Sequence, residues 1–206
     1  MTRRFDFACA LLPALVLSLG GAPAVAQKAP TAPAPSPQAA APAPQTPREQ
    51  LDALFGRLAA SKDSEESAGI VAAIDRLNLR SGSDTSDLLM SRAVATMESG
   101  NYPVSLSLLD ALVSLQPDWA EGWNKRATAR YLAGDEKGAV ADIAQTLTRD
   151  PRNLGALAGL GTILEDAGQR DQALRAYQRA LTIAPQWQPI VDAVARVKAA
   201  LAGQAL

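Results

Sequence analysis

Apolar side chains recur at helical spacing through the second half of the chain. Residues four positions apart fall on one face of an α-helix. Three apolar pairs with this spacing follow one another at regular intervals: Leu109 with Val113, Ile143 with Leu147, and Tyr177 with Leu181. Each pair predicts an apolar stripe along one helix, and the regular intervals predict that the same unit occurs three times.

Glycine and proline mark the same interval. Gly100, Gly134 and Gly168 are spaced by 34 residues, and so are Pro117, Pro151 and Pro185. Glycine suits the reversal after a first helix, and proline stops a second helix just beyond its end. A fixed period of this size indicates a repeat architecture. The pattern therefore predicts helix–turn–helix repeats at residues 86–119, 120–153 and 154–187.

Small residues occupy two further positions of the repeat, one on each helix. They let the two helices of a hairpin approach closely. On the first helices they are Ala93, Ala127 and Gly161, and on the second helices they are Ser105, Ala139 and Ala173.

This pattern resembles the tetratricopeptide repeat (TPR) family over residues 86–187. The third copy carries the likeness most fully, with Leu160, Gly161, Gly168, Ala173, Tyr177, Ala180 and Pro185. The second copy departs from the family pattern with Arg126 at the position of Leu160. The resemblance implies an all-α fold, a right-handed α-solenoid of helix–turn–helix repeats, and it says little about a particular ligand.

Amphipathic helices flank the three repeats. Residues 188–206 carry apolar residues at helical spacing and are predicted to form a capping helix that closes the last repeat. Residues 48–82 contain two apolar stripes separated by a break at residues 61–64, which predicts an N-terminal helical hairpin. A degenerate fourth repeat is one interpretation of this hairpin, because Gly56 would take its small position.

The N-terminus has the order of a secretory signal peptide. Arg3 and Arg4 precede an apolar run at residues 7–19, and a small-x-small site ends at Ala26. The run is shorter than the roughly 17–25 residues that span a bilayer, which favours cleavage over an uncleaved anchor. We expect residues 1–26 to be removed, residues 27–47 to form an Ala/Pro-rich disordered linker, and the mature chain to be periplasmic or secreted without stable membrane insertion.

Composition excludes most recognisable enzyme classes. The 206 residues include no histidine and one cysteine, Cys9, so histidine-dependent nucleophiles, histidine-ligated metals, disulfides and Cys-ligated clusters are not expected. The net charge of −1 gives no footprint for nucleic acid. Adjacent acidic pairs such as Glu165 and Asp166 do not face each other on a helix, which argues against carboxylate catalysis. We expect no enzyme activity, no cofactor and no metal.

Binding is expected on the concave face, which first helices line in stacked hairpins. The candidate peptide-binding groove comprises Met90, Val94, Met97, Asn124, Thr128, Tyr131, Thr162 and Glu165. One TPR subclass clamps C-terminal carboxylates, but of the corresponding residues here only Lys125 could serve. Trp119 and Trp187 recur at one repeat position, which suggests that they pack the inter-repeat loops. Asp142 is expected on the convex side of a second helix, where a charge reversal should affect binding far less than a change at Tyr131.

The resulting hypothesis is a non-enzymatic exported scaffold that binds a protein or peptide segment. An apolar segment with a few basic residues suits the groove best. The alternative is a structural or oligomerising subunit of a cell-envelope assembly, which would use the convex side or the ends of the solenoid.

Overall fold

The computed structural model describes residues 46–203, so the predicted signal peptide and most of the predicted linker lie outside the described part. Within residues 46–203 all regular structure is α-helical, which confirms the predicted all-α class. The helices are α1 (Pro47–Ala60), α2 (Ser64–Asn78), α3 (Asp84–Glu98), α4 (Tyr102–Leu115), α5 (Ala120–Leu132), α6 (Glu136–Arg149), α7 (Leu154–Asp166), α8 (Arg170–Ile183) and α9 (Gln188–Ala202). None of these described helices is long and apolar enough to cross a membrane.

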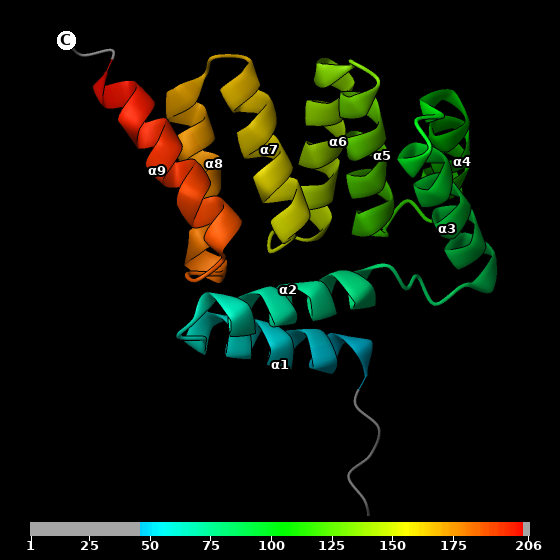
Figure 1. Cartoon of the computed structure of the whole chain (residues 1–206). Helices are drawn as coiled ribbons and strands as arrows, with labels where there is room; N and C mark the ends of the chain where they lie inside the picture. Colours follow the sequence, from blue (N-terminus) through cyan, green and yellow to red (C-terminus); the bar gives the residue numbers. More distant parts are fainter. Residues whose placement is uncertain (1–45, 204–206) are drawn as a thin grey trace, which may run out of the picture. The chain divides into compact units, whose positions relative to one another are not determined.

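Three helical hairpins, α3–α4, α5–α6 and α7–α8, stack side by side as the 34-residue period predicts (Figure 1). The glycine between the two helices of each hairpin has a positive φ: 78° at Gly100, 84° at Gly134 and 72° at Gly168. This left-handed conformation is strained for residues that carry a Cβ atom, and it ends the first helix of each hairpin.

The small residues lie where the two helices of a hairpin meet. Ala127 and Ala139 are buried, as are Gly161 and Ala173. A Cβ atom on Gly161 would overlap the ring of Tyr177, which packs from α8. In the first hairpin the hydroxyl of Ser105 donates a hydrogen bond to the Ala93 carbonyl oxygen at 2.9 Å.

Asp142, expected on the convex side of a second helix, is buried in an ion-pair cluster. Its side chain is 2% exposed and accepts two hydrogen bonds from Arg126, at 2.9 and 2.8 Å, with a third guanidinium contact from Arg130 at 3.0 Å. Arg126 also pairs with Asp110 of α4 at 2.8 Å. Arg126 occupies the position held by Leu160 in the third repeat, so this hairpin replaces an apolar contact with a buried ion pair that needs Asp142 opposite it.

The N-terminal hairpin α1–α2 does not continue the stack. It lies crosswise beneath the lower ends of α5 to α8, and α1 contacts α8 (Figure 1). Its core residues, which pack together with Leu154 and Ala184 of the repeats, are Phe55, Leu58, Ile70, Val71 and Ile74. The hairpin thus covers the ends of the repeat helices.

Polar contacts fix this hairpin toward its open end, where α1 begins and α2 ends. The indole N–H of Trp119 donates to the carbonyl oxygen of Asn78, at the end of α2, over 3.0 Å. Arg152, in the loop before α7, pairs with Asp52 at 2.8 Å and stacks on Phe55 with 4.3 Å to the ring centre. Trp119 therefore joins the hairpin to the repeats.

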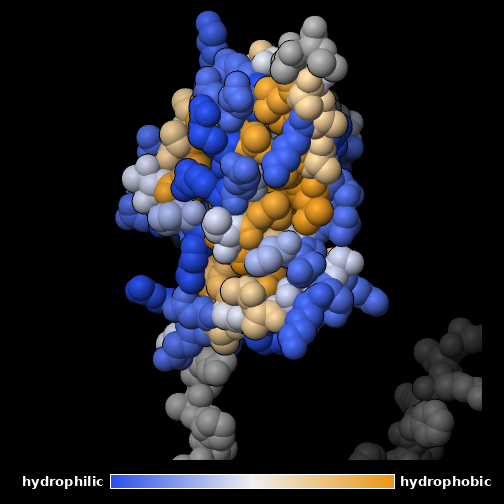
Figure 2. Space-filling model, turned by 90° about the vertical axis from the view of Figure 1, so that its left-hand side faces the viewer, coloured by the Kyte–Doolittle hydropathy of each residue, from blue (hydrophilic) through white to orange (hydrophobic). Residues whose placement is uncertain are grey.

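Helix α9 takes the place of the first helix of a further repeat. Trp187 precedes it as Trp119 precedes α5, and Ile190, Val194 and Val197 pack against the last hairpin. Ala195, which corresponds to the buried Ala127, is exposed because no second helix follows within the described residues. Seen from the α9 side, apolar residues form a band between hydrophilic flanks (Figure 2).

The packing of Gly161 predicts opposite effects for two glycines of α7. Gly161→Ala should lower the free energy of unfolding by about 1–3 kcal/mol, because the new methyl group overlaps Tyr177. Gly159→Ala should raise it by up to about 1 kcal/mol, because alanine favours the helix and its Cβ meets only Ile143 at 3.8 Å. Urea unfolding followed by circular dichroism compares the two. Similar effects in both variants would contradict this packing.

Candidate functional site

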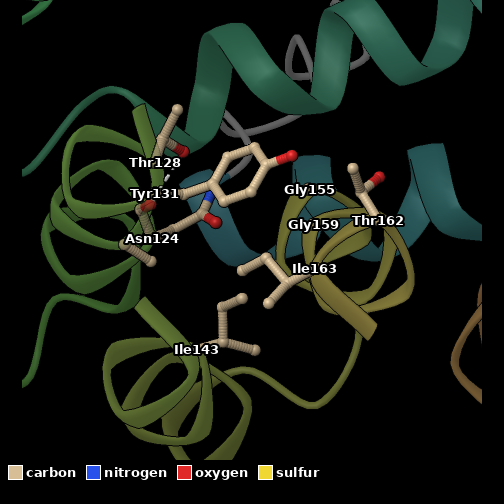
Figure 3. Close-up of a pocket in the computed structure, with 9 residues that line it drawn as sticks. Asn124, Thr128, Tyr131, Ile143, Gly155, Gly159, Thr162 and Ile163 are labelled. Atoms are coloured by element: carbon tan, nitrogen blue, oxygen red, sulfur yellow. Dashed lines mark hydrogen bonds between the residues drawn. The ribbon is translucent and has the colours of Figure 1, made fainter. Parts of the chain in front are cut away.

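A pocket of about 150 Å³ opens between the first helices α5 and α7 (Figure 3). Tyr131 and Thr128 lie on its α5 side and Thr162 on its α7 side, while Ile143 and Ile163 form an apolar base. The pocket is close in size to one aliphatic side chain.

Two glycines of α7 create this space. Gly155 and Gly159 lie one helical turn apart and face the pocket without side chains (Figure 3). Ile143 belongs to α6, behind the first helices, and reaches the pocket because Gly159 leaves it uncovered. The absence of two side chains is thus the feature that makes this part of the surface hollow.

Tyr131 is the largest side chain at the pocket. Its hydroxyl donates a hydrogen bond to the carboxylate of Asp166 on α7, which links the two first helices. This bond to an acceptor raises the pKa of Tyr131 to about 12. Below that pH Tyr131 is a neutral phenol, and its ring is held in place beside the pocket.

The candidate groove residues separate into two hollows. Asn124, Thr128, Tyr131 and Thr162 line the pocket between α5 and α7. Met90 and Val94 line a different hollow on α3, together with Leu79. Met90 is 3% exposed, and Met97 packs against the same core cluster. The hypothesis of one groove shared by Met90 and Tyr131 is therefore not what the structure shows.

Glu165 lies apart from the pocket in an ion pair. Its carboxylate accepts two hydrogen bonds from Arg196 of α9, both at 2.9 Å, and one from the Tyr177 hydroxyl at 3.1 Å. The hydrogen bonds from Arg196 lower the pKa of Glu165. Glu165 thus joins α7 to the capping helix, a contact that its place in the sequence does not predict.

A buried polar cluster lies at the Asn124 end of the pocket. Glu121, 5% exposed, accepts hydrogen bonds from Asn124 and Asn153 at 3.0–3.1 Å and pairs with Lys125 at 3.2 Å. Lys125 was the one residue suited to a carboxylate clamp. Its ammonium group is already neutralised by Glu121.

Residues 46–203 contain no candidate metal site. No group of three or more Asp, Glu, His or Cys side chains there could hold a metal ion. Acidic residues at helix starts have local roles: Asp135, for example, caps α6 by accepting a hydrogen bond from the Gly138 amide at 2.9 Å.

Comparison with known proteins agrees with this geometry. The tetratricopeptide repeat profile matches residues 155–187. A TPR repeat-containing protein of Rhizobium etli is 33% identical over 202 residues, which cover 98% of this chain and 97% of that protein. The chain belongs to the TPR family.

More distant TPR proteins match in part. Tetratricopeptide repeat protein 36 of Danio rerio is 28% identical over 47% of this chain and 54% of that protein. Among solved structures, the first TPR of Spaghetti (RPAP3), bound to an HSP90 peptide, superposes with a TM-score of 0.55 at 16% identity, over 57% of this chain and 93% of that one. MamA gives 0.51 at 15% identity, over 72% and 81%. These two structures support the TPR fold alone.

Proposed function

We propose that this TPR protein is a non-enzymatic scaffold that binds an extended or helical segment of another protein along its first helices. The pocket between α5 and α7 carries the proposal, because its space comes from missing side chains and it opens on the face that solenoid proteins commonly use. TPR structures with bound HSP90 and HSP70 peptides show that the family can bind such segments.

The walls of the pocket indicate what it would accept. Its base is apolar, and Thr128, Thr162 and the Tyr131 ring surround the opening. The nearby Asp166 is exposed and negatively charged. A segment with one aliphatic residue and a neighbouring basic residue complements this surface in shape and charge. No described group of side chains suggests chemistry beyond binding.

Two substitutions test the groove. Peptides are first selected from a displayed random library on the full chain, and their Kd values are then measured by calorimetry. Tyr131→Ala should weaken binding by about 1–3 kcal/mol through loss of the aromatic contact. Gly159→Leu should weaken it by filling the pocket, and its Cβ has room beside Ile143.

Leu132→Ala is the matched control, because Leu132 is exposed beside Tyr131 and does not line the pocket. Circular dichroism reports whether each variant retains its helices. If the selected peptides bind Tyr131→Ala and Gly159→Leu as tightly as the unchanged protein, the segment binds elsewhere.

We also propose that the protein is exported. The support is the N-terminal pattern of Arg3 and Arg4, the apolar run and the small-x-small site ending at Ala26. Cleavage there would make Gln27 the first residue of the mature chain. Intact mass of protein recovered from the producing cells measures this directly. Retention of Met1 in the recovered protein would reject cleavage.

A second candidate function, self-assembly, has its support at the α3–α4 end. Leu88 and Leu115 are 52% and 61% exposed there. The residues one and two repeats after Leu88, Gly122 and Ala156, are buried, and a Cβ on Gly122 would contact Val113 of the preceding repeat. The position of Leu88 thus joins one repeat to the next in the other two copies, and Leu115 is a further exposed leucine of the same hairpin. A second copy of the chain, with the same apolar residues, could cover them.

Sedimentation across a range of protein concentrations tests self-assembly. The protein should associate, and Leu88→Lys combined with Leu115→Lys should abolish association by placing two charges on the contact. Leu132→Lys, on an exposed leucine away from this end, is the control. A monomer at all concentrations, or loss of association only in the control, would refute the second candidate.

A further inference from the structure

A cavity outside the repeat groove lies where the N-terminal hairpin meets the repeats. It measures about 500 Å³, is open to solvent, and lies between the start of α1, the end of α2, and the loops before α5 and α7. We call it the basal cavity. None of the candidate groove residues lines it. Its volume is within the range of pockets that hold small organic molecules.

Four arginines from four segments line the basal cavity: Arg48, Arg80, Arg149 and Arg152. Two of them are held by the protein. Arg149 donates to the Pro117 carbonyl oxygen, and Arg152 pairs with Asp52. Arg48 and Arg80 are exposed, and neither guanidinium has a hydrogen bond or ion pair with any residue in the range 46–203.

The acidic residues of the lining do not balance these charges. Glu121 is already bonded to Asn124, Asn153 and Lys125. Asp150 accepts a hydrogen bond from the backbone amide of Arg152 at 3.1 Å. The lining therefore carries an excess of positive charge, and within residues 46–203 the guanidinium groups of Arg48 and Arg80 have no bound partner. A guanidinium group matches carboxylate and phosphate oxygens with paired hydrogen bonds.

The remaining walls are largely apolar. Leu51 comes from α1, Leu77 from α2, and Trp119 from the loop before α5. The indole N–H of Trp119 is used in its bond to Asn78, so Trp119 offers ring surface and no donor. A ligand with an anionic group and a compact organic body would satisfy both parts of the cavity.

We propose that the basal cavity binds a small organic anion through its carboxylate or phosphate group, with Arg48 and Arg80 as the main contacts. The site shares no lining residue with the pocket between α5 and α7. Arg48 belongs to the hairpin and Arg80 follows it, whereas Arg149 and Arg152 belong to the repeats. An anion among them therefore joins the hairpin to the stack and stabilises the docked hairpin by binding only that form.

Citrate and pyrophosphate are suitable probes for the two anionic groups. Calorimetric titration of the full chain at constant ionic strength measures their Kd, and the melting temperature should rise with the concentration of the bound probe. Binding of citrate alone assigns the cavity to carboxylates, binding of pyrophosphate alone assigns it to phosphates, and binding of both supports a shared anion site.

Arg48→Ala combined with Arg80→Ala should raise the Kd roughly tenfold or more, because charge-assisted hydrogen bonds are lost. Arg57→Ala is the matched control, since Arg57 is exposed on α1 and does not line the cavity. If the double variant loses helical content, the single variants Arg48→Gln and Arg80→Gln carry the same comparison.

Absence of binding for both probes at millimolar concentration would overturn the proposal. An unchanged Kd in the cavity variants would overturn it as well. Equal weakening by Arg57→Ala would show a response to surface charge in general, and it too would overturn the site.

Discussion

Close approach of the two helices within each hairpin governs the arrangement of the other parts. Where Gly161 lies against Tyr177, a single added methyl group has no room, and Ala127 with Ala139 and Ala93 with Ser105 repeat the contact. Because the hairpins are alike, they stack in one direction and place their first helices side by side. The space between α5 and α7 follows from that arrangement, and so does its base, which Ile143 supplies from the second row of helices.

Local signals in the sequence were sufficient to predict the repeats. Gly134 and Pro151, for example, act on the backbone within a few residues, and the apolar stripes need only the helical period. The placement of α1–α2 could not be predicted in this way. Its contacts join residues about a hundred positions apart, such as Asp52 with Arg152, and each partner alone resembles an ordinary exposed charge. Burial of Asp142 was missed for a similar reason, because the two arginines that neutralise it lie on another helix.

The candidate site was predicted in part. Thr128, Tyr131 and Thr162 point into one pocket because the repeat period places them on facing sides of α5 and α7. Met90 lines a separate hollow. Glu165 forms an ion pair with Arg196 of the capping helix, and the repeat pattern does not predict this arginine because it lies outside the three repeats. Gly155 and Gly159 contribute to the pocket because they have no side chains. The positions of side chains in the sequence do not reveal the space that is left there. Whether the pocket binds a segment remains a prediction.

The fixed length of the docked hairpin also limits how many repeats can lie between its two points of attachment. One tie is Asn78 to Trp119 at the start of α5, and another is the packing of Phe55 with Ala184 at the end of α8. The 15 residues of α2 extend about 22 Å, and neighbouring helices are roughly 8–10 Å apart. A hairpin duplicated between these ties would move them apart by about one more helix spacing in each row, whereas the length of the α1–α2 hairpin would stay the same. Duplication inside the stack would therefore release the N-terminal hairpin, whereas growth beyond α9 would leave it in place.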